Sequence, residues 1–456
     1  MEESPTPRGN FLVRKQEHLK ETPKRMITCA PRNSLLEAAR DFAFSQLEST
    51  DITAAEDEIQ RILRTVAGVM MREVAVKMSG RSSYEGVRMS CECGGSAEFK
   101  GYRKRWIKTL HGEVEIERAY YRCRDCRRGY IPWDKRQGLD GRIWTPRVNE
   151  LVASTCAALP YKAALSLVER TTGLFIEESS GEEIVYDVGG RLRAEEKKAM
   201  SAALDIEKEV VTEASADRLY ISIDAAKAHT DGDWHDIKAA VIYEGKRLES
   251  KYVDTIDNPH YIAAQEKSED FGGRMYARAM QAGYDRARER VVLADGADWI
   301  WNEVSIHFPD SVKILDYFHA CEHIYRLASV LYGESNPKGK RWAKEHCKRL
   351  KERGPGSLIR AIKRRKARNK QDREALRLEF GYFNKHRRHM NYPRYRARGM
   401  MIGSGPVEAA CKVVVGQRLK QAGMRWTKNG ADVVLAVRCA LLGGEFDRIN
   451  KAARAA

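Results

Sequence analysis

Two aspartates each close a short apolar run, and a glutamate lies just inside a later helix start. They are Asp224 after residues 219–223, Asp295 after residues 291–294, and Glu408 after Ser404-Gly405-Pro406. Short apolar runs favour strands, and strands joined by a long helix pair in parallel, so both aspartates are expected at one sheet edge, about 4.8 Å apart. Two carboxylates at such a short distance repel each other unless a cation lies between them. Carboxylate oxygens suit Mg²⁺ or Mn²⁺, so the three acids predict a divalent metal site.

Each acid also has an ordinary interpretation. Asp224 and Asp295 can simply end their strands, and Glu408 can interact with the positive end of its helix dipole. Taken singly, these interpretations are favoured. Taken together, in a strongly basic chain, the acids favour the metal site.

Four cysteines form a second candidate metal site. Cys91-x-Cys93 and Cys123-x-x-Cys126 are separated by 29 residues, and alternating runs around His111-Gly112 predict a β-hairpin between them. This arrangement resembles a zinc ribbon, in which four thiolates bind one structural Zn²⁺. The first pair has one intervening residue instead of two, so His111 is an alternative ligand and free thiols are the alternative state. The other cysteines are interpreted as buried thiols: Cys29, Cys156, Cys321, Cys347, Cys411 and Cys439.

The charge of the chain indicates a polyanionic partner. The 456 residues carry 81 Lys+Arg against 64 Asp+Glu, a net charge of +17. Residues 338–370 hold fifteen basic residues and two acids, an excess that is better explained by nucleic-acid phosphate than by a solvated helix face. The cations expected to contact double-stranded DNA are Lys363, Arg364, Arg365, Lys366, Lys412, Arg418 and Lys420, with Arg103, Lys104, Arg105, Arg122, Arg124, Arg127 and Arg128 near the cysteines.

Periodicity predicts a multidomain α/β chain. Strands are expected at 219–224, 238–243, 250–256, 291–295 and 312–316, with a helix over 259–282 after the third strand. The predicted segments are a loose arm (1–30), a helical region (31–85), the ribbon (86–138), a helix-turn-helix-like region (139–205), a mixed-sheet core (216–325), a basic helical insertion (326–399) and a second part of the core (400–445). A plain helical bundle is an equal alternative over 139–205.

These residues together resemble the Asp-Asp-Glu transposases of bacterial insertion sequences, specifically the Kra type, and more distantly Mutator-like transposases. The resemblance covers about residues 90–440 and rests on Asp224, Asp295-Gly296-Ala297-Asp298-Trp299-Ile300, Asp316-Tyr317-Phe318-His319, Ile402-Gly403-Ser404-Gly405-Pro406-Val407-Glu408, and Arg418-Leu419-Lys420-Gln421-Ala422-Gly423-Met424-Arg425-Trp426. It implies a ribonuclease H-like core interrupted by an all-helical insertion. It also implies catalysis by Asp224, Asp295 and Glu408 with two Mg²⁺ or Mn²⁺ ions, and auxiliary roles for Asp316 and His319.

The predicted function is therefore metal-dependent DNA strand cleavage and transfer at terminal repeats. A homodimer or larger assembly is expected because two element ends must be paired. A non-catalytic DNA-binding regulator is the main alternative, and a zinc peptidase using His319-x-x-Glu322-His323 is a remote one. No apolar run approaches the roughly 20 residues of a membrane span, and the first residues do not resemble a leader, so a cytoplasmic, nucleoid-associated protein is expected.

Overall fold

The computed structural model describes residue 41 and residues 51–204, 216–246 and 255–455. It divides the chain into two compact units, Met1–Val66 and Ala67–Ala456. Helix α2 (Ile52–Met78) begins in the first unit and ends in the second. Both β-sheets lie in the second unit.

The first sheet is antiparallel and is built around one long hairpin. Strands β2 (Ser96–Thr109) and β3 (Gly112–Cys123) pair along their length, and the short strands β1 (Arg88–Ser90) and β4 (Gly129–Tyr130) flank them. Leu110 and His111 form the turn, and Gly112 has a φ of 103°, a conformation that glycine adopts without strain. One face of the hairpin buries Ile107 and Val114 in a small core with α3 (Pro132–Arg136). The predicted hairpin is therefore present, with longer strands than expected.

Three helices follow: α4 (Pro146–Ala158), α5 (Tyr161–Thr172) and α6 (Glu178–Leu204). They share one hydrophobic core with the C-terminal helices α16 (Lys428–Leu442) and α17 (Phe446–Arg454). At Gly189 the α6 and α16 backbones are so close that an added Cβ would lie 2.4 Å from the carbonyl oxygen of Val433. Residues 139–205, predicted from the sequence as a separate segment, thus pack against the C-terminal helices.

The second sheet has five strands in the order β7-β6-β5-β8-β9. They are β5 (Arg218–Thr230), β6 (Asp233–Lys246), β7 (Thr255–Ala264), β8 (Glu289–Ala294) and β9 (Val312–Leu315). Strands β5, β6 and β7 pair antiparallel, whereas β8 and β9 are added parallel to β5. Helices α7 (Ser268–Gln281) and α8 (Asp298–His307) make the crossovers, as long connections between parallel strands require. The chain is therefore a multidomain α/β protein with mixed sheets.

One predicted boundary is wrong. The expected helix over 259–282 begins only at Ser268, and residues 255–264 form strand β7 instead. Residues 250–254 of the expected third strand lie outside the described residues. Pro259 favoured a helix start, but β7 is an edge strand, where a residue without an N–H is tolerated. Asn258, with a φ of 46°, lies at an irregularity in the pairing with β6.

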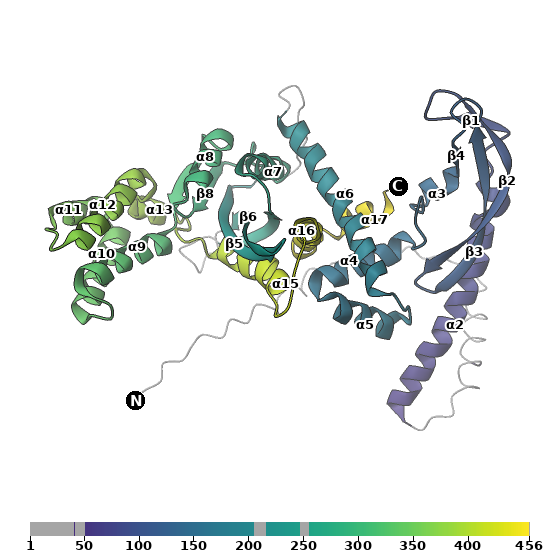
Figure 1. The fold of residues 1–456 in the computed structure, drawn as a ribbon, viewed down its shortest axis with the longest axis horizontal. Helices are drawn as coiled ribbons and strands as arrows, with labels where there is room; N and C mark the ends of the chain where they lie inside the picture. Colours follow the sequence, from purple (N-terminus) through teal and green to yellow (C-terminus); the bar gives the residue numbers. More distant parts are fainter. Residues whose placement is uncertain (1–40, 42–50, 205–215, 247–254, 456) are drawn as a thin grey trace. The chain divides into compact units, whose positions relative to one another are not determined.

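Every described element between β9 and residue 400 is helical, as predicted for the insertion (Figure 1). These elements are α9 (Tyr317–Tyr332), α10 (Pro337–Arg353), α11 (Gly356–Arg364), α12 (Lys370–Lys385), the 3₁₀ turn η2 (Arg387–His389) and α13 (Tyr392–Ala397). Asn336 caps α10, which continues with Pro337, and Asn369 caps α12. Asparagine at the cap and proline in the first turn are common helix-start signals.

The chain then returns to the sheet through α14 (Gly405–Ala410), a single π-helical turn η3 (Cys411–Gly416) and α15 (Gln417–Leu419). Helix α14 packs against β5 and β6, and η3 packs against β5. This segment therefore brings Glu408 and Cys411 to the strand that carries Asp224.

No helix in the described part of the chain is both long enough and apolar enough to cross a lipid bilayer.

Candidate active site and metal centre

Three acids stand side by side on three neighbouring strands. Asp295 and Asp316 directly follow β8 and β9, whereas Asp224 lies within β5, which continues to Thr230 instead of ending at the aspartate as expected. Ile223 pairs with Ala294 between β5 and β8, and Ala294 pairs with Leu315 between β8 and β9. The next residue on each strand is therefore Asp224, Asp295 or Asp316. Because the pairing is parallel, all three carboxylates belong to one sheet edge. The predicted neighbourhood of Asp224 and Asp295 is present, and Asp316 extends it by one strand.

The neighbouring carboxylates surround Asp224 with negative charge. Burial raises the pKa of Asp224, and the charges of Asp295 and Asp316 raise it further, against the hydrogen bond from the Ala225 N–H and the nearby His319. A carboxyl whose charged form is disfavoured in this way is relieved by a cation. The electrostatics of the edge therefore suit a positively charged ligand.

Asp316 also organises the loop that leads to Glu408. Its side chain is buried, caps α9 by accepting from the Phe318 N–H at 2.9 Å, and accepts from the Ser404 hydroxyl at 2.6 Å. The Tyr317 N–H donates to the Ile402 carbonyl at 2.8 Å. These bonds occupy both Asp316 oxygens, which agrees with a positioning role for this residue.

Glu408 lies on the correct helix, but its carboxylate faces solvent. Val407 and Ala410 are buried against the sheet, whereas the Glu408 side chain is 63% exposed and pairs with Lys412 at 2.7 Å. Within the described residues, the carboxylates of Asp224, Asp295 and Glu408 do not form a group whose ligand atoms all lie within 4.8 Å of one another. The predicted triad is thus brought to one region without converging.

Cys411 is a site residue that sequence reasoning missed. It is the first residue of the π-helical turn, and its Sγ lies 3.9 Å from Asp224 Oδ2. Burial and the nearby Asp224 raise the pKa of Cys411 to about 12, so it stays a thiol. Single π-turns are frequent at functional sites. Its spacing of three from Glu408 was the available signal, but nothing else separated it from the other scattered cysteines.

The insertion reaches the acidic edge through Tyr382 of α12. An added Cβ at Gly296, the residue after Asp295, would lie 2.3 Å from the Tyr382 ring, so a larger residue there would displace this ring. Tyr382 stacks on His323 at 3.7 Å between ring centroids, and His323 pairs with Glu379 at 2.8 Å. The structure thereby gives His323 packing and pairing partners, and no described group of three close metal ligands includes His319 or His323. This geometry argues against the peptidase interpretation.

Arg418 is not a surface cation, which contradicts its predicted role in contacting DNA. Its side chain is fully buried, and its Nε donates to the Cys156 carbonyl at 2.9 Å. Trp426 packs against its guanidinium, 4.6 Å from the ring centroid. Arg438 similarly donates to the Ala157 carbonyl at 2.7 Å. Both arginines thus bind the carbonyl end of α4, where positive charge is favourable.

The other predicted cations divide into accessible and occupied ones. The accessible side chains lie on the insertion and beyond the glutamate helix; they are Lys363, Arg364, Arg365, Lys366, Lys412 and Lys420. In the hairpin, Arg105 points inward to Asp134 at 3.2 Å, and Lys104 pairs with Glu115 at 3.1 Å. The exposed cations near the cysteines are Arg122, Arg124, Arg127 and Arg128. Arg103, whose guanidinium lies over the Tyr120 ring, and Lys104 are also exposed, so the basic side chains of this sheet lie both at its cysteine end and midway along the hairpin.

The four predicted cysteines converge. Their sulfur atoms all lie within 4.8 Å of one another, with 3.7 Å from Cys91 to Cys126 and 3.6 Å from Cys93 to Cys123. A tetrahedral site with Zn–S bonds of about 2.3 Å needs sulfurs about 3.8 Å apart. The Gly95 N–H and the neighbouring thiols lower the pKa of Cys93 to about 7. Against the hydrogen bond from the Cys93 N–H, burial and the same neighbouring thiols raise the pKa of Cys91 to about 12, so without a metal the cluster favours one thiolate among thiols. This cluster could hold a metal ion.

His111 is excluded as a substitute ligand. It forms the hairpin turn beside Gly112, whereas Cys123 pairs with Ala97 at the opposite end of the same strands. At about 3.3 Å per residue, these ends are roughly 35 Å apart. The short Cys91-x-Cys93 pair closes instead through a tight loop, in which the Gly94 N–H donates to the Cys91 carbonyl at 2.9 Å.

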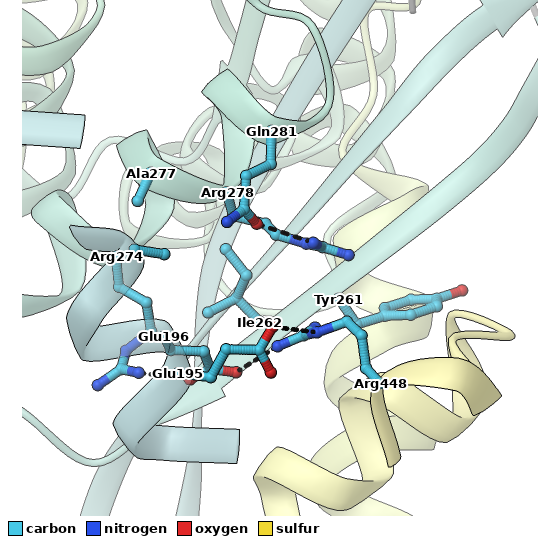
Figure 2. Close-up of a pocket in the computed structure, with 10 residues that line it drawn as sticks. Glu195, Glu196, Tyr261, Ile262, Arg274, Ala277, Arg278, Gln281 and Arg448 are labelled. Atoms are coloured by element: carbon cyan, nitrogen blue, oxygen red, sulfur yellow. Dashed lines mark hydrogen bonds and ion pairs between the residues drawn. The ribbon is translucent and has the colours of Figure 1, made fainter. Parts of the chain in front are cut away.

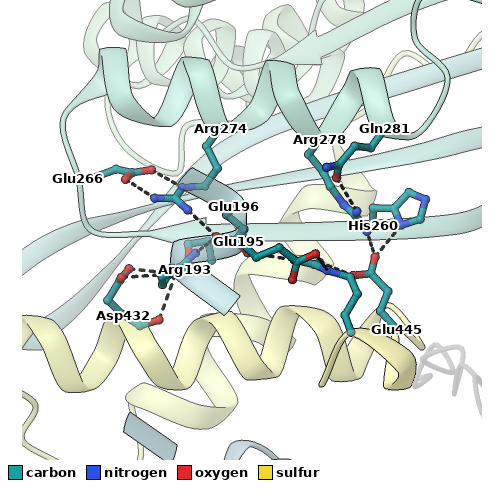
Figure 3. A network of polar contacts seen from close by, with 12 residues as sticks. Arg193, Glu195, Glu196, His260, Glu266, Arg274, Arg278, Gln281, Asp432 and Glu445 are labelled. Atoms are coloured by element: carbon teal, nitrogen blue, oxygen red, sulfur yellow. Dashed lines mark hydrogen bonds and ion pairs between the residues drawn. The ribbon is translucent and has the colours of Figure 1, made fainter. Parts of the chain in front are cut away.

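A separate cluster of charges joins α6, α7, β7 and the C-terminal helices, and it is structural. Arg193 pairs with Asp432 at 2.9 Å, and Arg274 pairs with Glu266 at 2.8 Å (Figure 3). The cavity beside it, lined by Glu196 and other paired residues, has a volume of about 20 Å³, which suffices for one water molecule (Figure 2). Its charges already have partners, so we assign no ligand to it.

Comparison with known proteins gives the chain a family. A protein from Streptococcus gallolyticus named "UPF0236 protein in vanSb 3′region" is 23% identical over 354 residues, which cover 77% of this chain and 75% of the relative. Residues 96–453 match the family described as "Uncharacterised protein family (UPF0236)". The match includes the hairpin, the acidic sheet edge, the helical insertion and the glutamate helix, so this chain belongs to the UPF0236 family.

Proposed function

We propose that this protein is a DNA transposase that cleaves and joins strands with the help of divalent metal ions. The observation that carries the proposal is the alignment of Asp224, Asp295 and Asp316 at one level of three adjacent strands, next to the helix that bears Glu408. Closely spaced carboxylates in a protein with a net charge of +17 suit metal-dependent chemistry on a polyanion.

The five-stranded sheet supports a ribonuclease H-like core. Three antiparallel strands are followed by two parallel strands, and the first strand in sequence lies at the centre. The resemblance implies a catalytic Asp, Asp, Glu triad and an all-helical insertion before the glutamate helix. The positions of Asp224 on β5, Asp295 after β8 and Glu408 on α14 support this assignment.

The donor set fits magnesium or manganese. Asp224, Asp295 and Glu408 offer hard carboxylate oxygens, and we propose that Glu408 exchanges Lys412 for metal when DNA and ions bind. The three acids would hold two such ions, which would supply Lewis acidity toward the attacking water or 3′ hydroxyl and toward the leaving oxygen in an in-line displacement at phosphorus. Asp316 would hold the loop before Glu408, and His319, which lies near Asp224, would act as a positioning residue.

Two basic surfaces away from the acids would bind DNA. The exposed cations of the insertion, represented by Lys363 and Arg364, would contact the phosphate backbone. The cysteine cluster would bind Zn²⁺ and thereby fix the arginines around it, because thiolates in tetrahedral geometry are typical zinc ligands. Pairing two element ends would require two or more copies of the chain.

A nicking assay on element-end DNA tests the proposal. We expect Mg²⁺-dependent cleavage by the wild type and none by Asp224→Asn, Asp295→Asn or Glu408→Gln, with DNA affinity retained by all three. His323→Gln is the control for the peptidase alternative, because it changes the His319-x-x-Glu322-His323 motif and keeps the three acids. Cleavage by the three acid variants at the wild-type rate would disprove this mechanism.

The exposed Glu408 favours a second candidate, a DNA-binding regulator derived from a transposase. A carboxylate that stays paired with Lys412 cannot complete a metal site. This candidate predicts specific DNA binding with no cleavage in Mg²⁺ or Mn²⁺, and the same assay therefore separates the two.

A further inference from the structure

The outer face of the β2–β3 hairpin carries an ordered set of side chains that the proposed chemistry does not use. Residues directly opposite each other share this face: Lys104 with Glu117, Trp106 with Glu115, and Lys108 with Glu113. We call these six residues the hairpin outer face. Lysines and a tryptophan form one column along β2, and glutamates form the neighbouring column along β3.

The tryptophan at the centre of this face is unusually accessible. Trp106 is 58% exposed, whereas Ile107 and Val114, on the opposite face, are buried. Tryptophan is enriched at the centres of protein–protein interfaces, because its large apolar ring gains most from removal from water. Trp106 is therefore the candidate anchor of a docking surface.

The charges of this face identify the kind of partner. Lys104 pairs with Glu115 at 3.1 Å and Lys108 with Glu113 at 3.4 Å, and Glu117 adds a third carboxylate. The face is thus neutral to slightly acidic although the chain is strongly basic. A nucleic-acid surface needs an excess of cations, so the column of glutamates favours a protein partner.

The two columns are complementary to themselves. A two-fold axis that lies above the hairpin outer face, parallel to the strands and midway between the two columns, places the lysine column of one copy over the glutamate column of the other. Lys104 then faces the partner's Glu117 and Lys108 faces the partner's Glu113. Trp106 faces the partner's Glu115, so the two Trp106 rings lie diagonally across the axis from each other. An isologous interface of this kind, in which one patch binds itself, is typical of symmetric dimers.

We propose that the hairpin outer face binds a second copy of this chain. Six side chains bury less surface than the roughly 800 Å² per partner of a standard stable interface, so the dimer is weak in dilute solution. Binding of two copies to one DNA molecule raises their effective concentration and strengthens the contact without new interactions. The inference concerns assembly alone and does not depend on catalysis.

Charge reversal tests this inference with the full chain. In Lys104→Glu/Lys108→Glu both columns become acidic, and in Glu113→Lys/Glu117→Lys most of the face becomes basic. Sedimentation measured over a range of protein concentrations should show a weak dimer for the wild type and monomers for each variant alone. An equimolar mixture of the two variants should form a heterodimer, because unlike columns again face each other.

The controls separate this contact from unfolding and from a net-charge effect. Lys197→Glu/Lys198→Glu changes the net charge equally at exposed positions on α6 and should leave the dimer intact. Trp106→Ala should weaken dimerisation by about tenfold or more. Dimers in either charge-reversed variant alone, monomers in the mixture, or a wild type that is monomeric at every concentration would overturn the proposal. Loss of DNA binding without a change in mass would instead assign the face to nucleic acid.

Discussion

Replacing Asp224 by asparagine should stabilise the metal-free protein while it abolishes cleavage. Asp224 and Asp295 directly follow the paired residues Ile223 and Ala294, so they lie side by side on adjacent strands. Two charges about 4.8 Å apart repel by about 3 kcal/mol at an effective dielectric constant near 20. Because both side chains are partly exposed, solvent reduces this to on the order of 1 kcal/mol. Asparagine keeps an oxygen for the Ala225 N–H, which donates to Asp224 at 2.7 Å.

The sign of the pH dependence follows from the raised pKa of Asp224. A carboxyl with a raised pKa in the folded state contributes stability below its unfolded pKa of about 4 and loses that contribution as the pH rises through its folded pKa. The advantage of Asp224→Asn should therefore be full at pH 7 to 8 and disappear near pH 4. In metal-free buffer at pH 7.5, thermal melting should show an increase on the order of 2 °C.

Metal addition supplies the decisive comparison. Ions that bind only the folded state stabilise it by RT ln(1 + [ligand]/Kd), about 2.7 kcal/mol at a hundredfold excess over Kd. Mn²⁺ should therefore raise the melting temperature of the wild type and not that of Asp224→Asn. Asp236→Asn, on the exposed surface of β6, is the matched control and should behave as the wild type. Equal stabilisation of both by Mn²⁺, or a less stable metal-free Asp224→Asn, would refute the reasoning.

Three further predictions concern stability. Cys123→Ser should remove bound zinc, measured as about one ion per chain in the wild type, and should make the hairpin sensitive to proteolysis; an unchanged metal content would contradict it. Gly189→Ala should lower the urea midpoint by the equivalent of about 1–3 kcal/mol, because the added Cβ would meet the backbone of α16. Gly190→Ala is the matched control, because Gly190 has open space around it, and its midpoint should not change. Equal midpoints for the two variants would argue against the close contact at Gly189. Burial lowers the pKa values of His386 and His389 to about 4, so the stability of the folded protein should fall as the pH drops from about 6.5 to 4. In melting experiments, His386→Gln/His389→Gln should make the melting temperature depend less on pH over this range. An unchanged pH dependence would exclude these residues as its source.

Local patterns in the sequence determined the elements that carry the candidate site. The apolar runs before Asp224 and Asp295 form strands, the Ser404-Gly405-Pro406 turn begins the helix of Glu408, and the two cysteine pairs flank a hairpin. These features depend on short-range periodicity and on turn residues, which a single sequence records directly. The parallel pairing that brings the two aspartates together also followed from one connection length.

Side-chain direction was decided by the tertiary structure. Arg418 and Lys420 are two residues apart in one basic segment, yet the first is buried against α4 and the second is exposed. The difference arises because Arg418 meets the free carbonyls at the end of α4, about 260 residues earlier in the chain. Neither periodicity nor composition contains such a contact.

Contacts between distant segments also explain the other differences between the sequence-based predictions and the structure. Pro259 lies in a strand because β7 is at the sheet edge, and Cys411 lies 3.9 Å from Asp224 because the π-turn that it begins packs against β5. The hairpin outer face became visible only once register paired each lysine or tryptophan with a glutamate. The sequence by itself determined which residue types are available and which local elements present them. Long-range packing alone decided which of them share a surface, because that depends on contacts between segments far apart in the chain.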